Sequence, residues 1–257
     1  MIEGQEGVTW PQWVALAHAA EEARLDALFR SDHYRSIGRG DPNGSLDAWG
    51  TTCALATITS TIRLGTLVSP VTFRSASVLA KLATTADHIS DGRVELGIGA
   101  GWFESEHKAY GFDFMTTRRR LDELDRQLAE ITRQWTQADD IWPKPIQQPR
   151  PRIIVGGTAK PRTVAAAVGH ADEYNTFGPT VAEAHERRQI LDAAAARAGR
   201  EPLAFSIMIE LKGDADELEE QLRAYADVGV ERVMLQHLDH EDVERVAVLG
   251  EVAARLR

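Results

Sequence analysis

Residues 63–99 read RLGTLVSPVTFRSASVLAKLATTADHISDGRVELGIG, and this stretch predicts a strand, a helix and a second strand in succession. Arg63–Val68 and Val94–Gly99 are short apolar runs of strand length. Ala76–Ile89 is a strongly apolar segment of helical length that Ser75 can cap and Asp91-Gly92 can end. Two strands joined by a crossover helix are the unit from which parallel sheets are built, so we expect a parallel α/β fold.

The same alternation continues on both sides of this stretch. The predicted strands span residues 27–30, 63–68, 94–99, 153–155, 171–174, 203–210 and 232–236. The predicted helices span residues 10–22, 46–59, 76–89, 104–110, 117–135, 162–168, 181–198, 215–227 and 242–256. A closed barrel needs eight strands, and the missing one belongs before the first helix, where only Met1-Ile2-Glu3 remain. We therefore expect one domain, residues 1–257, folded as a TIM (β/α)8 barrel with a truncated first strand.

Composition narrows the class of protein. The 257 residues lie near the roughly 250 of a single (β/α)8 barrel. The net charge of −10 argues against general binding to nucleic acid or anionic membranes. The single cysteine, Cys53, excludes an internal disulfide, and its apolar helix predicts a buried, inert thiol. No membrane-length apolar run or signal peptide is evident, so we expect a cytoplasmic protein.

In barrels of this type the active site lies at the C-terminal ends of the strands. This rule selects Asp32-His33, residues 66–70, residues 99–102, Gly156-Gly157-Thr158, Asn175-Thr176 and Gln236-His237. His33, beside Asp32, is the sharpest candidate, because imidazole can donate, accept or carry a proton near neutral pH. The alternative is a histidine that only hydrogen-bonds a loop.

Two glycine-rich turns admit more than one interpretation. Residues 97–101, GIGAG, do not form a dinucleotide fingerprint, because Trp102 stands where the third glycine should be. They either allow tight packing or let the backbone approach a flat ring that Trp102 walls. Gly156-Gly157-Thr158 is either a plain turn or an anion site at a helix start, which Lys160 and Arg162 would favour.

Other motifs give weaker evidence of function. His237 and His240 have metal-like spacing but no matching cluster of ligands, so we predict no metal site. Arg118-Arg119-Arg120 is interpreted as a solvated helix face. The sequences G-x-S-x-G and G-x-x-x-x-G-K-[ST] are absent, so neither α/β-hydrolase nor P-loop chemistry is supported.

Several segments, taken in order, resemble the luciferase-like monooxygenase superfamily, and most closely its deazaflavin (coenzyme F420)-dependent oxidoreductases. The resemblance covers nearly the whole chain and is carried by residues 19–22, 26–28, 31–33, 64–71, 91–102, 106, 110–111, 119–121, 142–145, 148–149 and 153–157. It implies a barrel that holds a flavin or deazaflavin ring at its C-terminal mouth. His33, with Asp32, would contact the ring or relay a proton.

The resemblance also implies cofactor contacts and a cis peptide bulge behind the ring near Thr66 and Leu67. The implied cofactor-binding residues are Thr66, Leu67, Ser69, Gly99, Gly101, Trp102, Gly156, Gly157, Thr158, Asn175 and Thr176. Basic candidates for an anionic F420 tail are Arg35, Arg39, Arg74, Lys160 and Arg162.

The implied activity is hydride transfer between C5 of F420 and a small organic substrate, in a homodimer. One alternative is an FMN-dependent monooxygenase supplied by a separate flavin reductase, and another is a non-catalytic flavin-binding or assembly barrel. In the sugar-phosphate dehydrogenases of this family a glutamate follows the glycines, where this chain has Trp102, and this difference argues against a sugar phosphate as substrate. Relatives also usually carry a glycine between the first helix and the second strand, where this chain has Arg24-Leu25. Residues 136–142 lack a hairpin insertion found before Pro143 in relatives, which predicts a more open site or one completed by a partner subunit.

Overall fold

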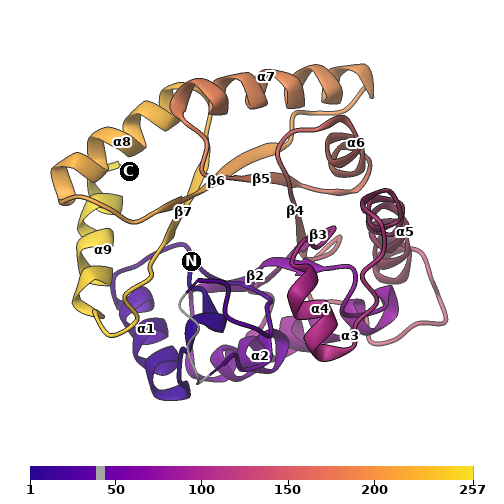
Figure 1. Ribbon diagram of the computed structural model, residues 1–257, viewed down its shortest axis with the longest axis horizontal. Coiled ribbons are helices and arrows are strands. Elements are labelled where there is room, and N and C mark those ends of the chain that lie inside the picture. The colour runs from indigo at the N-terminus through magenta and orange to yellow at the C-terminus, as the bar shows by residue number, and fades with distance from the viewer. Residues whose placement is uncertain (39–43, 257) are drawn as a thin grey trace.

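The computed structural model describes residues 1–38 and 44–256, in which helices surround a ring of parallel strands (Figure 1). The strands, in their order around the sheet, are β1 (Ala27–Arg30), β2 (Arg63–Pro70), β3 (Val94–Gly99), β4 (Arg152–Gly156), β5 (Glu173–Phe177), β6 (Ala204–Glu210) and β7 (Arg232–Gln236). The helices are η1 (Gly4–Glu6, a 3-10 turn), α1 (Trp10–Glu22), α2 (Ala48–Ile58), α3 (Ala76–Ser90), α4 (Glu104–Tyr110), α5 (Thr117–Thr136), α6 (Pro161–His170), α7 (Val181–Arg197), α8 (Ala215–Asp227) and α9 (Glu244–Leu256). Strands that are consecutive in the sequence are also neighbours in the sheet, as repeated right-handed βαβ units require.

A remnant of the eighth strand closes the ring between β7 and β1. Ile2 forms a parallel bridge to Arg30 on one side and to His237 on the other. The Ile2 amide donates to the Phe29 carbonyl at 2.9 Å, and the His237 amide donates to the Met1 carbonyl at 2.9 Å. The predicted (β/α)8 barrel with a truncated first strand is therefore confirmed.

Ion pairs occupy the N-terminal pole of the barrel, where the strands begin. Arg232 lies 2.6 Å from Glu95 and 2.5 Å from Glu173, and both carboxylates are almost fully buried. Burial favours the neutral form of Glu95, but hydrogen bonds from Arg232 and Arg63 outweigh it and lower its pKa. The Arg232 guanidinium also lies over the Phe29 ring at 5.2 Å. This pole is therefore charged, and its ion-paired side chains line a shallow surface hollow.

The hydrophobic core has two layers. Phe29, Leu67, Ile154 and Met234 pack together inside the barrel. A larger cluster, which includes Leu96, fills the space between the strands and the surrounding helices. A filled interior leaves the carboxyl ends of the strands as the face on which a site can form.

Several element boundaries differ from those expected, and three of them bear on the site. α2 begins at Ala48 rather than residue 46, because Asp47 caps it by accepting a hydrogen bond from the Gly50 amide at 2.8 Å. β2 continues to Pro70 through a shift of register between Thr66 and Ser69. β5 begins at Glu173 and runs to Phe177, so Asn175 and Thr176 lie within the strand.

The segment between α5 and β4, residues 137–151, contains neither helix nor strand, in line with the shortened insertion expected there. Among the helices of the described chain, none is long and apolar enough to cross a membrane.

Candidate functional site

His33 stands at the mouth of the barrel, just beyond the end of β1. Its Nδ1 atom lies 3.0 Å from Oε1 of Glu106 in α4. Its ring meets Trp102 and Phe103 edge-on, with centroid distances of 6.0 and 6.2 Å. The side chain is 16% exposed, and Nε2 has no hydrogen-bond partner within residues 1–38 and 44–256. The second ring nitrogen is therefore available to a bound molecule.

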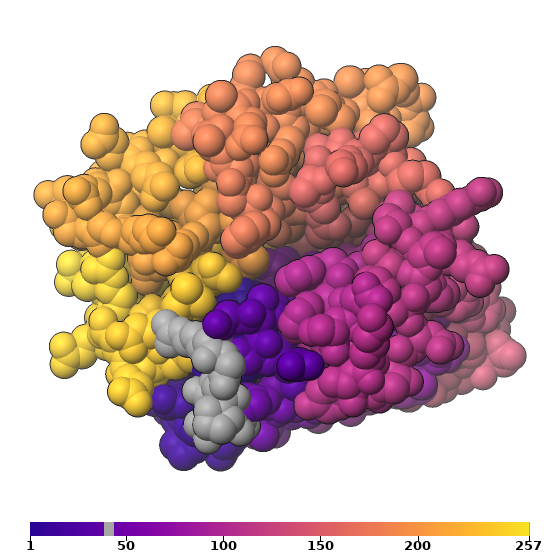
Figure 2. Space-filling view, in the orientation of Figure 1, coloured from indigo at the N-terminus to yellow at the C-terminus, as the bar shows by residue number. Residues whose placement is uncertain are grey.

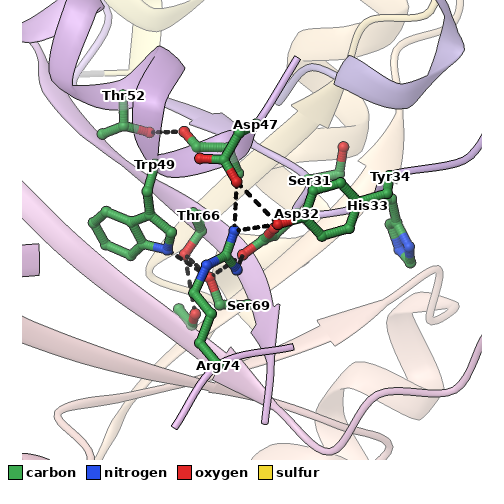
Figure 3. A network of polar contacts seen from close by, with 12 residues as sticks. Ser31, Asp32, His33, Tyr34, Asp47, Trp49, Thr52, Thr66, Ser69 and Arg74 are labelled. Atoms are coloured by element: carbon green, nitrogen blue, oxygen red, sulfur yellow. Dashed lines mark hydrogen bonds and ion pairs between the residues drawn. The ribbon is translucent and has the colours of Figure 1, made fainter. Parts of the chain in front are cut away.

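Asp32 points the other way, into a buried polar network behind β2 (Figure 3). Its Oδ2 accepts hydrogen bonds from Ser69 Oγ and Arg74 Nη1, each at 2.6 Å. Ser69 Oγ lies 3.1 Å from Thr66 Oγ1, and Trp49 of α2 donates its indole N–H to Ser69 at 3.1 Å. In Figure 3 the His33 ring lies apart from these contacts. Asp32, Thr66 and Ser69 thus support the mouth from behind and do not line it.

Val68 projects from the bulge of β2, which contains a cis peptide bond between Leu67 and Val68. A Cβ atom on Gly99 would meet Val68 Cγ2 at 2.6 Å, and one on Gly156 would meet Cγ1 at 3.2 Å. On Gly97, a Cβ would lie 2.0 Å from the Thr66 carbonyl oxygen. We call Val68, Gly99 and Gly156 the seat, because the two glycines leave the space into which the half-buried Val68 side chain fits near the ends of β3 and β4. The position of the cis peptide agrees with the expected bulge.

The far wall of the mouth comes from the opposite strands. Asn175 points into the barrel, where its amide donates to Ser206 Oγ at 2.9 Å. Since alternate side chains of a strand share a face, Phe177 lies on the same side as Asn175, one layer nearer the mouth. Phe177 is 60% exposed and Trp102 is 61% exposed. Figure 2 shows a depression between the region of α4 and the orange residues that follow β5.

Tyr174 organises the turn after β4. Its hydroxyl accepts a hydrogen bond from the Ala159 amide and lies 2.8 Å from Thr163 Oγ1. A Cβ on Gly157 would meet this hydroxyl at 2.4 Å, and the Gly157 amide already donates to the Asn175 carbonyl at 3.0 Å. Gly157 is therefore a packing glycine with its N–H in use, which corrects its expected role as an anion donor. Thr158 is exposed beside it.

Thr176 is buried on the outer face of β5, because its neighbours Asn175 and Phe177 face inward. Its hydroxyl accepts a hydrogen bond from Arg187 of α7. The structure does not bring this side chain to the mouth.

Arg120 holds the loop that follows β3 at the mouth of the barrel. Gly101 has a φ of +78°, a conformation that favours glycine, and its carbonyl accepts from Arg120 Nε at 3.2 Å. Arg120 is buried and lies over the Phe114 ring, whereas Arg118 and Arg119 are exposed. The prediction of a solvated face is therefore wrong for Arg120.

Arg74 was expected near the anionic tail of a cofactor, but its guanidinium is already used within the protein. Its side chain is 8% exposed and pairs with Asp32 and, at 2.8 Å, with Asp47. Burial opposes its charge, but these carboxylates and Tyr34 raise the pKa of the guanidinium. Exposed basic groups remain at the mouth or beside the turn after β4: Arg35, Lys160, and Arg162, which pairs with Asp122. Arg39 lies outside the described residues.

The two histidines with metal-like spacing are both buried. His237 Nε2 lies 3.0 Å from the Asp242 carbonyl, and burial lowers the pKa of its ring. Within the described chain, no group of three His, Cys, Asp or Glu side chains is placed to hold a metal ion.

The sequence does not single out two residues of the site. Glu106 belongs to the resemblance, but no local pattern links it to His33, which it contacts across 73 positions of sequence. Val68 lies within residues 66–70, which the strand-end rule selects, but nothing in the sequence distinguishes it from its neighbours in that range. The signal that could have found Val68 is the pair of glycines facing it from neighbouring strands.

A parallel barrel with chemically active side chains at the carboxyl ends of its strands defines the class of α/β barrels that bind ligands at that mouth. The sequence model of the luciferase-like monooxygenase family matches residues 2–255, and the chain belongs to that family. An uncharacterised protein of Mycobacterium tuberculosis is 29% identical over 93% of this chain and 83% of its own length.

Proteins similar to this chain include both FMN-dependent and F420-dependent enzymes. The FMNH2-dependent dimethylsulfone monooxygenase of Pseudomonas putida is 30% identical over 58% of this chain and 44% of its own length. An F420-dependent secondary alcohol dehydrogenase, solved with an F420–acetone adduct, superposes with a TM-score of 0.83. That superposition covers 100% of this chain and 98% of the other at 15% identity, so it supports the fold alone.

Proposed function

We propose that this protein is an F420-dependent oxidoreductase that moves a hydride between the deazaflavin and a small organic substrate. The observation that carries the proposal is the open Nε2 of His33, placed at the mouth on the side of Trp102. A proton-transferring group at the cofactor-binding mouth is what an alcohol–carbonyl interconversion needs from the protein.

The residues at the mouth suit a flat ring. Val68 and two glycines without side chains form the seat, and the exposed ring faces of Trp102 and Phe177 stand beside the mouth. A bound deazaflavin would supply the hydride acceptor or donor at C5. Thr158 and Lys160, exposed at the start of α6, are the residues we assign to the anionic tail, where helix amides also favour negative charge.

The chain's own contribution is to hold the substrate oxygen and to move its proton. His33 Nε2 accepts the proton of a substrate hydroxyl in the oxidising direction and returns it in the reducing direction. Trp102 and Phe103 cover the ring edge of His33 and limit the access of water to it. Asp32 acts at a distance, by fixing Ser69 and the bulge that carries Val68.

A second candidate is an FMN-dependent monooxygenase, favoured by the 30% identity to the dimethylsulfone enzyme. In that case the partner would be a reductase that supplies reduced flavin. The seat itself suits either ring, since both are flat and tricyclic.

A binding titration separates the two. The purified protein is mixed in turn with F420 and with FMN, and binding is read from the fluorescence of each cofactor. Saturable binding of F420 supports the proposal. Binding of FMN alone contradicts it, and binding of neither favours a barrel without catalytic function.

His33→Ala is expected to keep the fold and lower turnover by about 10²-fold, the usual scale for a general acid–base group. His18→Ala, at an exposed position of α1, is the matched control and should be unchanged. Equal turnover in the His33 and His18 variants would remove His33 from the mechanism.

A further inference from the structure

Glu106 connects α4 to the loop after β1 through both oxygens of its carboxylate. It is fully buried, on the first turn of α4. Its Oε1 lies 3.0 Å from His33 Nδ1, and its Oε2 accepts hydrogen bonds from the backbone amides of Tyr34 at 2.5 Å and Arg35 at 3.1 Å. Three consecutive residues of the loop after β1 are thus bound to one side chain.

The chemistry of these atoms determines which histidine nitrogen carries the proton. An ionised carboxylate only accepts hydrogen bonds, so Nδ1 must hold a hydrogen to lie 3.0 Å from it. The opposite tautomer would set two lone pairs against each other in a buried place. Nε2 is then the unprotonated nitrogen, and it is the one that faces the mouth.

No lysine or arginine pairs with Glu106 in the part of the chain that the structure describes, and His33 is its one ionisable partner there. A positive charge that forms on the imidazole during proton transfer would therefore have a buried counter-charge already in contact with it. Such outer partners of a functional histidine commonly set both its tautomer and its orientation.

We propose that Glu106 is a positioning residue for His33, which fixes the Nδ1–H tautomer and stabilises the protonated ring. This inference rests on the proposed function and assigns its substrates to compounds with a hydroxyl that becomes a carbonyl. In the oxidising direction His33 Nε2 takes the proton of the substrate hydroxyl, and a bound deazaflavin would take the hydride from the carbon that carries this hydroxyl. The chain is then left with an imidazolium paired with Glu106, and the substrate becomes a carbonyl compound.

The structure offers a matched control on the same helix. Tyr110, at the end of α4, donates its hydroxyl to the Tyr34 carbonyl at 2.9 Å. Tyr110→Phe removes a bond between α4 and the same loop but leaves His33 Nδ1 untouched. Glu106→Gln keeps the size of the side chain and removes its charge and one acceptor oxygen.

The direct test is long-range ¹H–¹⁵N NMR of ¹⁵N-histidine-labelled protein without cofactor, at a pH where the imidazole is neutral. The His33 signals are assigned from their absence in His33→Ala. We expect the wild-type and Tyr110→Phe spectra to show a protonated Nδ1 and an unprotonated Nε2, and Glu106→Gln to show a mixture of tautomers. A protonated Nε2 in the wild type, or an unchanged tautomer in Glu106→Gln, overturns the proposal.

The wild-type spectrum needs no variant, so the test survives if Glu106→Gln does not fold. It also needs no cofactor, so failure of F420 to bind would overturn the proposed function and leave the tautomer result intact. In turnover, Glu106→Gln should lose about 10- to 100-fold at unchanged F420 affinity, as for other outer-shell partners. Equal losses in Glu106→Gln and Tyr110→Phe would reduce Glu106 to a loop anchor.

Discussion

Replacing Gly99 with alanine tests the seat directly, because the new methyl group has a single obstacle. Its Cβ would lie 2.6 Å from Val68 Cγ2, well inside van der Waals contact, and 3.8 Å from Val68 Cβ. A clash with one side chain can be relieved by shortening that side chain. We therefore expect Gly99→Ala to be destabilising alone and to be rescued by Val68→Ala.

The magnitudes follow from packing. Inserting a methyl group into a well-packed site costs about 2 kcal/mol in the free energy of unfolding. Val68→Ala alone removes two methyl groups from a half-buried side chain and costs about 1 kcal/mol. Independent effects would sum to about 3 kcal/mol, whereas the double variant should lose only about 1 kcal/mol, a coupling of about 2 kcal/mol.

Urea unfolding followed by tryptophan fluorescence measures all four free energies of the cycle. Gly156→Ala is the graded comparison, because its Cβ would approach Val68 Cγ1 only to 3.2 Å and should cost less. Gly97→Ala should cost the most and resist rescue, since its Cβ would lie 2.0 Å from a backbone oxygen. Additive losses for Gly99 and Val68 would refute the reasoning.

Two further predictions concern stability. Arg232→Met leaves the buried carboxylates of Glu95 and Glu173 with one arginine each, and should cost about 3 kcal/mol by urea unfolding. Glu21→Gln should cost about 1 kcal/mol at neutral pH, allowing for solvent screening, because one Glu21 oxygen accepts hydrogen bonds from the amides of residues 60–62. Partial burial favours the neutral acid, but these bonds lower the pKa of Glu21 to about 2. Since this lies below its ordinary value of 4.5, the stabilisation is complete above about pH 4.5 and is lost as the pH falls towards 2.

Neighbouring positions provide the controls. Arg152 also pairs with Glu173 but is 42% exposed, so Arg152→Met should cost about 1 kcal/mol or less. A loss as large as that of Arg232→Met would show that burial is not the source of the effect. Glu22 is adjacent to Glu21, and a difference between the two glutamine variants that persists at pH 2 would contradict the assigned pKa.

The order of strands and helices was predictable because apolar periodicity is a local property. Val94–Gly99 and Ala76–Ser90 could be recognised from runs of their own residues. Even the truncated first strand followed from counting, and Ile2 now fills that place with one bridge on each side. Boundaries were less accurate where a side chain outside the pattern decides them, as Asp47 does at the start of α2.

The site was harder, because its arrangement depends on contacts between distant segments. Strand ends indicated His33 and the glycines near it, but not the direction of each side chain. Successive side chains of an extended chain point to opposite sides. Asp32 and His33 therefore point apart although they are neighbours, and Thr176 of β5 faces outward between Asn175 and Phe177. The bond from Glu106 to His33 joins separate βα units, and no local pattern encodes it.

The packed interior has a consequence for kinetics. Phe29, Ile154 and Met234 fill the barrel below the mouth, and Arg232 closes the pole beneath Phe29. In the part of the chain that the structure describes, the filled interior leaves no passage through the barrel, so anything bound on the seat enters and leaves at the mouth. A product that has not yet departed blocks the next substrate, so product inhibition should be competitive with the substrate it replaces.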